Sequence, residues 1–311
     1  MADNVGNTMG KDYHLDVAPR FDGFHVKGLS HCSWGMKNRL SRIFRPSSGN
    51  TVMLAFDHGY IMGSTSGLER LDIVIEPLLP FVDVLMATRG ALRSCVSPST
   101  DKPLCIRATH DASVLHEDMS VGGGAGLDME DALRMNASAL AVQTFIGAPG
   151  EGDSLELLCR AVDQGERYGI PVLGVVAVGK QLVRNARYFL LATRILAEHG
   201  AQMVKTYYCG DFEEIAAACP VPIVIAGGKK LPEDEALTMA YRAVREGARG
   251  VDMGRNIFRG TPAAGGGHEV PDREAYEAVL DSMAMAVGKV VHEGFTDREA
   301  YEAFLEIKNR S

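Results

Sequence analysis

From Thr51 onward, short apolar runs alternate with longer amphipathic segments. In several of the longer segments apolar residues recur at i, i+3, i+4 and i+7, for example at Leu155, Leu158, Cys159 and Val162, which predicts helices with one buried face. The short runs are too brief for helices and begin about 20 to 35 residues apart. They predict eight strands, over residues 52–56, 82–87, 104–108, 139–146, 171–178, 201–205, 221–226 and 250–254.

The predicted helices carry matching end signals. Gly169, Gly200 and Gly247 each follow one of them, at the place where a helix commonly ends on a left-handed residue. Pro232 and the acidic residues 233–235 suit the first turn of the helix that Gly247 ends. The periodicity and the end signals therefore predict the same helices.

Continuous apolar strands joined by helices are typical of a parallel sheet covered by helices. Eight such units favour closure into a (β/α)8 barrel, the TIM barrel, over an open doubly wound sheet, which is the alternative. We expect this barrel to be one catalytic domain over residues 51–311. Two closing helices are predicted at its end, about 271–292 and 297–308, the second opened by a capping box of Thr296 and Glu299.

The first 50 residues predict an N-terminal extension of a different kind. Residues 1 to about 30 are mainly polar and suggest an extended arm. The segment Met36 to Phe44 predicts a short helix that Pro46 ends. We therefore treat residues 1–50 as an arm and a short helix placed before the barrel.

Composition narrows the class of function. A net charge of -8 and a pI near 5.6 disfavour nucleic acid and anionic membrane surfaces as partners, since both need a concentrated positive field. The six cysteines have no C-x-x-C spacing, which indicates reduced thiols and a cytoplasmic protein. There is no apolar run long enough to cross a membrane and no export signal. A small diffusible substrate fits these features.

Lys205 is the sharpest candidate for chemistry. Active sites of such barrels lie at the carboxyl ends of the strands, and Lys205 ends the sixth predicted strand. Partial burial favours the neutral amine, lowering a lysine pKa from about 10.4, and a neutral amine can attack a carbonyl to form a Schiff base. The alternative is a lysine that reaches solvent or pairs with a carboxylate.

Two loops after the seventh and eighth strands predict a phosphate site. Gly227 and Gly228 lie in one loop, and Gly254 and Arg255 in the other. Glycines let backbone N–H groups approach a phosphate, and an arginine adds a charge-assisted hydrogen bond. The alternative is that the first glycine pair only forms a tight turn.

Asp57 and His58, after the first strand, are candidates for moving protons. The alternative is an aspartate that hydrogen-bonds loop amides. His58, His110, Asp111 and His116 lack the spacing of a metal motif, so we predict no metal site.

Four strings, FDHG (56–59), VKT (204–206), IAGGKK (225–230) and VDMGRN (251–256), resemble the DeoC/archaeal-type class I aldolase family. The similarity extends from about residue 10 to the C-terminus and is greatest to a thiolase branch of that family. It implies that Lys205 is the Schiff-base lysine, and that Asp57 lies beside the imine. It also implies that the phosphate is held by Gly227, Gly228, Gly254 and Arg255.

The resemblance implies a reaction and an assembly as well. An acetyl group would pass from 3-hydroxy-5-phosphonooxypentane-2,4-dione, a product of phospho-autoinducer-2 breakdown, to coenzyme A, leaving dihydroxyacetone phosphate. Coenzyme A would be a co-substrate, with no bound cofactor, and the chain would form a homo-oligomer, typically a decamer of two stacked rings.

One departure from the archaeal aldolases concerns the fifth strand, where the chain reads GVVAVG (174–179). Val176 stands at the position of their acid/base tyrosine, and Val178 at that of an arginine for a second phosphate. This argues against a sugar bisphosphate as substrate. Two alternatives stay open, a class I aldolase acting on a ketose phosphate and a non-catalytic barrel that binds a sugar phosphate.

Overall fold

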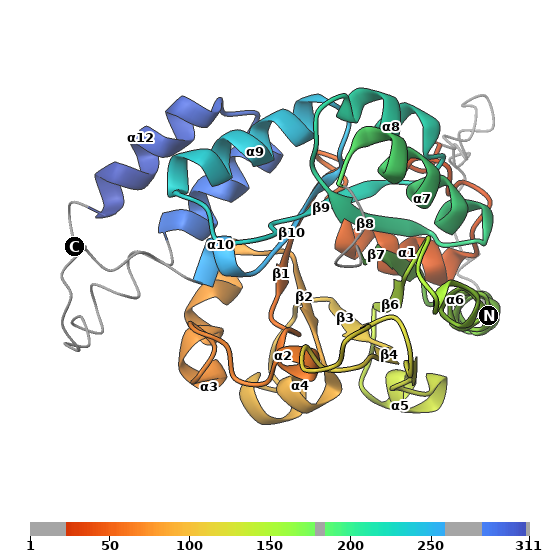
Figure 1. Ribbon diagram of the computed structural model, residues 1–311. Coiled ribbons are helices and arrows are strands. Elements are labelled where there is room, and N and C mark those ends of the chain that lie inside the picture. Colours follow the sequence, from red (N-terminus) through yellow and green to blue (C-terminus); the bar gives the residue numbers. More distant parts are fainter. Residues whose placement is uncertain (1–22, 178–183, 259–281, 309–311) are drawn as a thin grey trace, which may run out of the picture.

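The computed structural model describes residues 23–177, 184–258 and 282–308. Eight parallel strands close into a barrel in the order β1-β2-β3-β6-β7-β8-β9-β10, with β10 paired back to β1 (Figure 1). The predicted TIM barrel is therefore confirmed, and the open sheet is excluded. The barrel strands are β1 (Thr51–Ala55), β2 (Val84–Ala87), β3 (Leu104–Arg107), β6 (Ala139–Thr144), β7 (Val172–Val176), β8 (Met203–Tyr207), β9 (Ile223–Ala226) and β10 (Gly250–Met253).

The strands are apolar along their length because both of their faces are covered. One face points into the barrel and the other lies under the surrounding helices, so nearly every strand residue is buried. A charged residue inside such a strand has no route to bulk water unless it lies near the mouth. Arg107, Lys205 and Asp252 are the charged residues of these strands.

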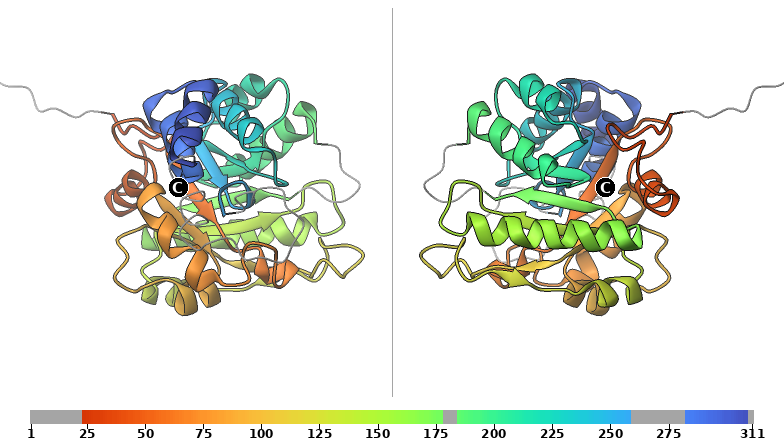
Figure 2. Two further views of the ribbon diagram at one scale, coloured as in Figure 1. Left: turned by 90° about the vertical axis from the view of Figure 1, so that its left-hand side faces the viewer. Right: turned by 90° about the vertical axis from the view of Figure 1, so that its right-hand side faces the viewer.

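Helices surround the barrel and begin and end near the predicted positions (Figures 1 and 2). Gly169, Gly200 and Gly247 have φ of 71°, 92° and 108°, as expected for helix ends. The α-helices are α1 (Trp34–Ile43), α2 (Gly59–Met62), α3 (Leu71–Val74), α4 (Arg89–Cys95), α5 (Met129–Arg134), α6 (Glu151–Tyr168), α7 (Ala186–Glu198), α8 (Phe212–Ala218), α9 (Glu233–Arg245), α10 (Arg255–Phe258) and α12 (Asp297–Lys308).

Smaller elements complete the described fold. A 3-10 helix, η1 (Glu76–Phe81), precedes β2. Beyond β3, the short strands β4 (Thr109–His110) and β5 (Gly124–Ala125) form an antiparallel pair. The pair lies past the carboxyl end of β3, on the side where the active site is expected.

Residues 23–33 differ from the extended polar arm expected from sequence. They form turns that pack on the barrel, with Val26 and Leu29 buried. The Lys27 ammonium donates hydrogen bonds to the carbonyls of Ala216 and Cys219, at 2.8 and 2.7 Å. These carbonyls lie at the carboxyl end of α8, where a cation is favourable. Two apolar residues and one lysine therefore fix a segment whose overall composition is polar.

The C-terminal part confirms one closing helix and leaves the other largely outside the described residues. α12 begins at the predicted capping box, in which Thr296 N donates to Glu299 Oε2 at 2.8 Å and Glu299 N donates to Thr296 Oγ1 at 3.3 Å. Of the helix predicted over 271–292, residues 282–288 are helical and continue into a π-helix, η2 (Lys289–Glu293). α12 packs beside α9 (Figure 1). None of the described helices has both the length and the apolar character needed to cross a membrane.

Candidate active site

Lys205 lies inside the barrel near its carboxyl-terminal mouth. The residue is 9% exposed, and its side chain crosses the interior from β8 to the opposite wall. Nζ lies 2.8 Å from Asp252 Oδ2 on β10 and 3.5 Å from Met86 Sδ on β2. Because β10 and β2 both flank β1, the amine lies beside β1, and Asp57 follows the end of that strand. Lys205 thus pairs with a carboxylate within the barrel and does not reach bulk solvent.

Asp252 is the acidic partner of this amine. Its side chain is fully buried, and neither of its oxygens has a partner with hydrogen-bond geometry in the described residues, so the 2.8 Å contact is an ion pair with poor angular geometry. Burial raises the pKa of Asp252 above its ordinary value, and the charge of Lys205 offsets only part of that effect. Asp252 is therefore a buried carboxylate with a raised pKa that lies 2.8 Å from the lysine amine.

Asp57 forms a second buried ion pair, with Arg107 at the end of β3. Both Nε and Nη2 of Arg107 donate to Asp57 Oδ2, at 2.9 and 2.6 Å. Burial alone would raise the pKa of Asp57, but the charges of Arg107 and Lys205 and the hydrogen bonds from Arg107 outweigh it, and the pKa is lowered. Asp57 is therefore a stable negative charge next to the amine.

His58 is the next residue and is mostly buried. Desolvation lowers its pKa to about 4, assisted by the positive charges of Lys205 and Arg255 and opposed by Asp57. The imidazole is therefore neutral at physiological pH. It packs edge-on against Phe258 with ring centroids 5.8 Å apart, and its Nδ1 has no hydrogen-bond partner in the described residues.

A polar network continues from Arg107 across the mouth. Tyr60, on α2, lies under the Arg107 guanidinium at 5.0 Å from the ring centroid. Its hydroxyl donates to Asp111 Oδ2 at 2.7 Å and lies 3.0 Å from Gln143 Oε1. Burial raises the pKa of Tyr60, and the hydrogen bond to Asp111 adds to that effect. Through Tyr60, the network joins Arg107 to the segment after β4 and to β6.

The two glycine loops lie side by side at the ends of β9 and β10. Buried Asn256 joins them, because its Nδ2 donates to Gly227 O and its Oδ1 accepts from Leu231 N, each at 2.8 Å. Gly228 has a φ of 67°, a conformation that favours glycine. A Cβ on Gly254 would lie 2.2 Å from Ala55 O and 2.7 Å from His58 Cε1. The predicted phosphate loops are thus adjacent, and Gly254 brings them against His58.

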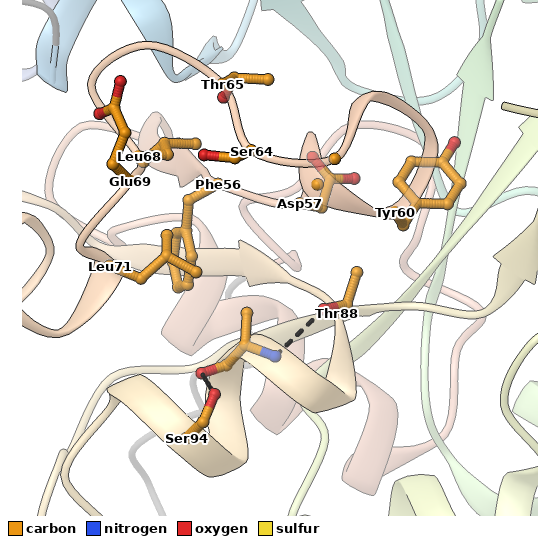
Figure 3. Close-up of a pocket in the computed structure, with 13 residues that line it drawn as sticks. Phe56, Asp57, Tyr60, Ser64, Thr65, Leu68, Glu69, Leu71, Thr88 and Ser94 are labelled. Atoms are coloured by element: carbon orange, nitrogen blue, oxygen red, sulfur yellow. Dashed lines mark hydrogen bonds between the residues drawn. The ribbon is translucent and has the colours of Figure 1, made fainter. Parts of the chain in front are cut away.

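A pocket of about 370 Å³ opens beside this cluster (Figure 3). Its lining comes mainly from the segment after β1, Asp57 included, and from Thr88, Ala91 and Ser94 at α4. Of the catalytic candidates, Asp57 is the one that lines this pocket.

Residues 51–260 match the family model described as DeoC/LacD family aldolase. The chain belongs to the DeoC/LacD aldolase family. The family resemblance predicted from the four motifs is thereby confirmed.

The similarity to individual proteins extends over almost the whole chain. It is 51% identical over 309 residues to a 3-hydroxy-5-phosphonooxypentane-2,4-dione thiolase of Photorhabdus laumondii, covering 99% of this chain and 100% of that protein. An Escherichia coli protein of the same name is 50% identical, with the same coverage. An uncharacterised aldolase of Pasteurella multocida is 49% identical, again covering 99% and 100%.

Solved structures show the same fold. An archaeal fructose 1,6-bisphosphate aldolase superposes with a TM-score of 0.69 at 23% identity, covering 83% of this chain and 100% of that one. A fructose-bisphosphate aldolase of Slackia heliotrinireducens gives a TM-score of 0.72 at 16% identity, covering 93% and 96%. At these identities the likeness concerns the barrel alone.

All seven predicted site residues of this DeoC/LacD family barrel lie at the carboxyl-terminal mouth. Val176, the departure on the fifth barrel strand, is buried at the end of β7, and Val178 lies outside the described residues. The described residues contain no group of three His, Cys, Asp or Glu side chains that could hold a metal ion.

Three parts of the site were not predicted from sequence: Asp252, Arg107 and the Tyr60 network. A signal for the first two was present, because each is a charged residue inside an apolar run, and buried charges are usually paired. Tyr60 carried no comparable signal, since its role depends on contacts with Asp111 and Gln143, which are distant in sequence.

Proposed function

We propose that this protein is a thiolase that transfers the acetyl group of 3-hydroxy-5-phosphonooxypentane-2,4-dione to coenzyme A and releases dihydroxyacetone phosphate. The observation that carries the proposal is the Lys205 amine, buried in the barrel mouth beside a carboxylate able to take its proton. The near full-length identity of about half to proteins named for this thiolase activity supports the choice of substrate.

The first step is formation of the imine. In our proposal, Asp252 takes a proton from Lys205, and the neutral amine attacks C4, the ketone carbon next to the phosphorylated carbon. Loss of water then gives an iminium. Gly227, Gly228, Gly254 and Arg255 would hold the phosphate through backbone N–H groups and one guanidinium. The adjacency of their two loops supports this assignment.

The second step breaks the carbon–carbon bond. The thiolate of coenzyme A attacks C2, the acetyl carbonyl carbon, and forms a tetrahedral oxyanion. As that oxyanion collapses, the C2–C3 bond breaks and its electron pair moves to the iminium, which gives acetyl-CoA and an enamine. A proton added at C3 and hydrolysis of the resulting imine release dihydroxyacetone phosphate and regenerate Lys205.

Asp57 and His58, in the loop after β1, would have different roles in this scheme. The lowered pKa of Asp57 makes it a poor proton acceptor, so we assign it the role of a fixed negative charge that stabilises the iminium. His58, with a pKa of about 4, is a neutral hydrogen-bonding group between Asp57 and the phosphate loops.

We also propose a homo-oligomer, the decamer of two stacked rings implied by the family resemblance. Light scattering after size exclusion tests the subunit number. A reducing, cytoplasmic location is a further proposal, which the six free cysteines support.

The decisive assay supplies the phosphorylated dione with and without coenzyme A. We expect acetyl-CoA and dihydroxyacetone phosphate only when the thiol is present. Borohydride added with the dione should reduce an imine and increase the mass of the peptide that contains Lys205. An unmodified Lys205 in an active protein would contradict the covalent mechanism.

The same assay separates the thiolase from a class I aldolase acting on a ketose phosphate. The aldolase would release dihydroxyacetone phosphate and an aldehyde without any dependence on thiol. Aldol cleavage must deprotonate a hydroxyl, and buried Val176 offers no group for that step. A protein that only binds sugar phosphates would form neither product.

A further inference from the structure

We propose that the pocket between the loop after β1 and α4 binds the pantetheine arm of coenzyme A and delivers its thiol to the acetyl carbonyl. This inference rests on the proposed thiolase function and adds the site of its second substrate. The pocket has a volume of about 370 Å³, enough for an extended chain of this size (Figure 3).

The position of the pocket fits a second substrate. The phosphate loops lie at the ends of β9 and β10, and the amine of Lys205 contacts residues on both neighbours of β1. The pocket lies at the carboxyl ends of β1 and β2, because Phe56 and Asp57, which follow β1, and Thr88, which follows β2, are among its lining residues. A substrate anchored by its phosphate at β10 and by its imine at Lys205 would point its acetyl end toward Asp57, and the thiol would arrive from the other side.

The lining of the pocket matches a neutral chain that contains amides and methyl groups. Small and hydroxyl-bearing residues alternate with apolar ones, and no lysine or arginine lines the pocket. Its acids are Asp57, which is paired with Arg107, and Glu69. A phosphate would find no positive partner there, so the pocket suits the pantetheine part of coenzyme A and excludes its phosphates. The lining comprises Phe56, Asp57, Gly59, Tyr60, Gly63, Ser64, Thr65, Leu68, Glu69, Leu71, Thr88, Ala91 and Ser94.

Thr65 is a second, independent sign of a polar ligand. It is 8% exposed and lines the pocket, yet its hydroxyl has no hydrogen-bond partner in the described part of the chain. Buried hydroxyls are normally satisfied, and an unsatisfied one next to a cavity indicates a group that a ligand completes. After a rotation about χ1, an amide of the pantetheine arm can supply that partner.

Filling the pocket tests the proposal. A Cβ on Gly59 would meet no atom within 4 Å, so Gly59→Leu adds a side chain in open space at the pocket wall. We expect the KM for coenzyme A and for free pantetheine to rise by about tenfold or more, because both thiols insert the same arm. Borohydride trapping of dihydroxyacetone phosphate on Lys205 should keep its wild-type yield.

Two further variants and one control keep the test sharp. Ala91→Leu fills the pocket from α4 and should act like Gly59→Leu, while Thr65→Val should raise both KM values by about fivefold. Gly152→Leu is the control, because Gly152 on α6 also has no atom within 4 Å of an added Cβ and does not line the pocket. It should leave both KM values unchanged.

Three results would overturn the proposal. Unchanged KM values in both pocket-filling variants of an active enzyme would remove the arm from this pocket, whereas the proposed function would stand. A rise for coenzyme A but not for pantetheine would place the nucleotide there instead. A wild-type protein that traps dihydroxyacetone phosphate but makes no acetyl-CoA would contradict the proposed function, and this inference with it.

Discussion

Two buried ion pairs in the same barrel mouth differ in how they are made. Arg107 donates two hydrogen bonds to Asp57 and is held in turn by the Tyr60 network. Lys205 meets Asp252 through one contact of 2.8 Å without hydrogen-bond geometry. We infer that the arginine pair is the more rigid of the two and that the lysine pair is the reactive one.

The pKa directions express the same difference. The pKa of Asp57 is lowered and that of Asp252 is raised, although both carboxylates are buried at the same barrel mouth. Environments that separate two pKa values in one site commonly separate their roles. We infer that the Asp57–Arg107 pair maintains a constant electrostatic field, and that the Asp252–Lys205 pair takes part in the reaction.

The largest effect is expected at the reactive pair. Lys205→Arg keeps a positive charge beside Asp252 but removes the nucleophile, so turnover should fall by about 10⁴-fold or more. The measurement is the initial rate of acetyl-CoA formation, with borohydride trapping as the second observable. Circular dichroism of the variant should match that of the wild type. Retention of more than a tenth of the activity would show that Lys205 is not the nucleophile.

At the Asp57–Arg107 pair, a substitution should mainly lower the stability of the fold. Arg107→Gln leaves Asp57 buried without its partner, and we expect the free energy of unfolding to fall by about 3 to 5 kcal/mol. Urea titration at a fixed protein concentration measures it. Arg298→Gln, which breaks an exposed pair with Glu302, is the control and should leave the urea midpoint unchanged. Equal midpoints for the two variants would refute a stabilising role for the Arg107 pair.

His58 lies between the Asp57–Arg107 pair and the phosphate loops. Its lowered pKa predicts that the free energy of unfolding depends on pH. Its pKa is about 4 in the folded protein and about 6.5 in an unfolded chain, so the unfolded state binds more protons between these values. The contribution of His58 to the free energy of unfolding is complete above pH 6.5. As the pH falls toward 4, about 3 kcal/mol of it is lost. Urea titrations across that range should show a steeper loss for the wild type than for His58→Gln. Parallel curves would rule out a neutral, buried imidazole.

These predictions also show what sequence could and could not supply. The barrel was predictable because its eight apolar runs and their helices repeat a pattern set by burial on both faces. Lys205, Asp57 and the glycine loops were predictable because they follow strand ends, where such barrels place their sites. The two pairings were not, since Arg107 and Asp57 are 50 residues apart and only barrel closure brings Asp252 against Lys205.

A smaller effect is expected when only the proton acceptor is removed. Asp252→Asn keeps the shape of the side chain and the nucleophile, so turnover should fall by about 10²-fold and not to zero. The rate of borohydride trapping should fall in parallel and recover as the pH is raised, because the amine can then lose its proton to solvent. A variant that traps the ketone at the wild-type rate at neutral pH would show that Asp252 only balances charge.

The smallest effect is expected at Thr206, the neighbour of Lys205 within the VKT motif. Adjacent strand residues face opposite sides, so Thr206 points away from the interior that Lys205 enters, and its buried hydroxyl has no hydrogen-bond partner in the described residues. Thr206→Val replaces that hydroxyl with a methyl group of similar size, which is nearly neutral or stabilising at an unsatisfied site. We expect wild-type kinetics and an equal or higher urea midpoint. A large loss of activity would mean that both faces of β8 contribute to catalysis. It would contradict the assignment of the reaction to the Lys205–Asp252 pair alone.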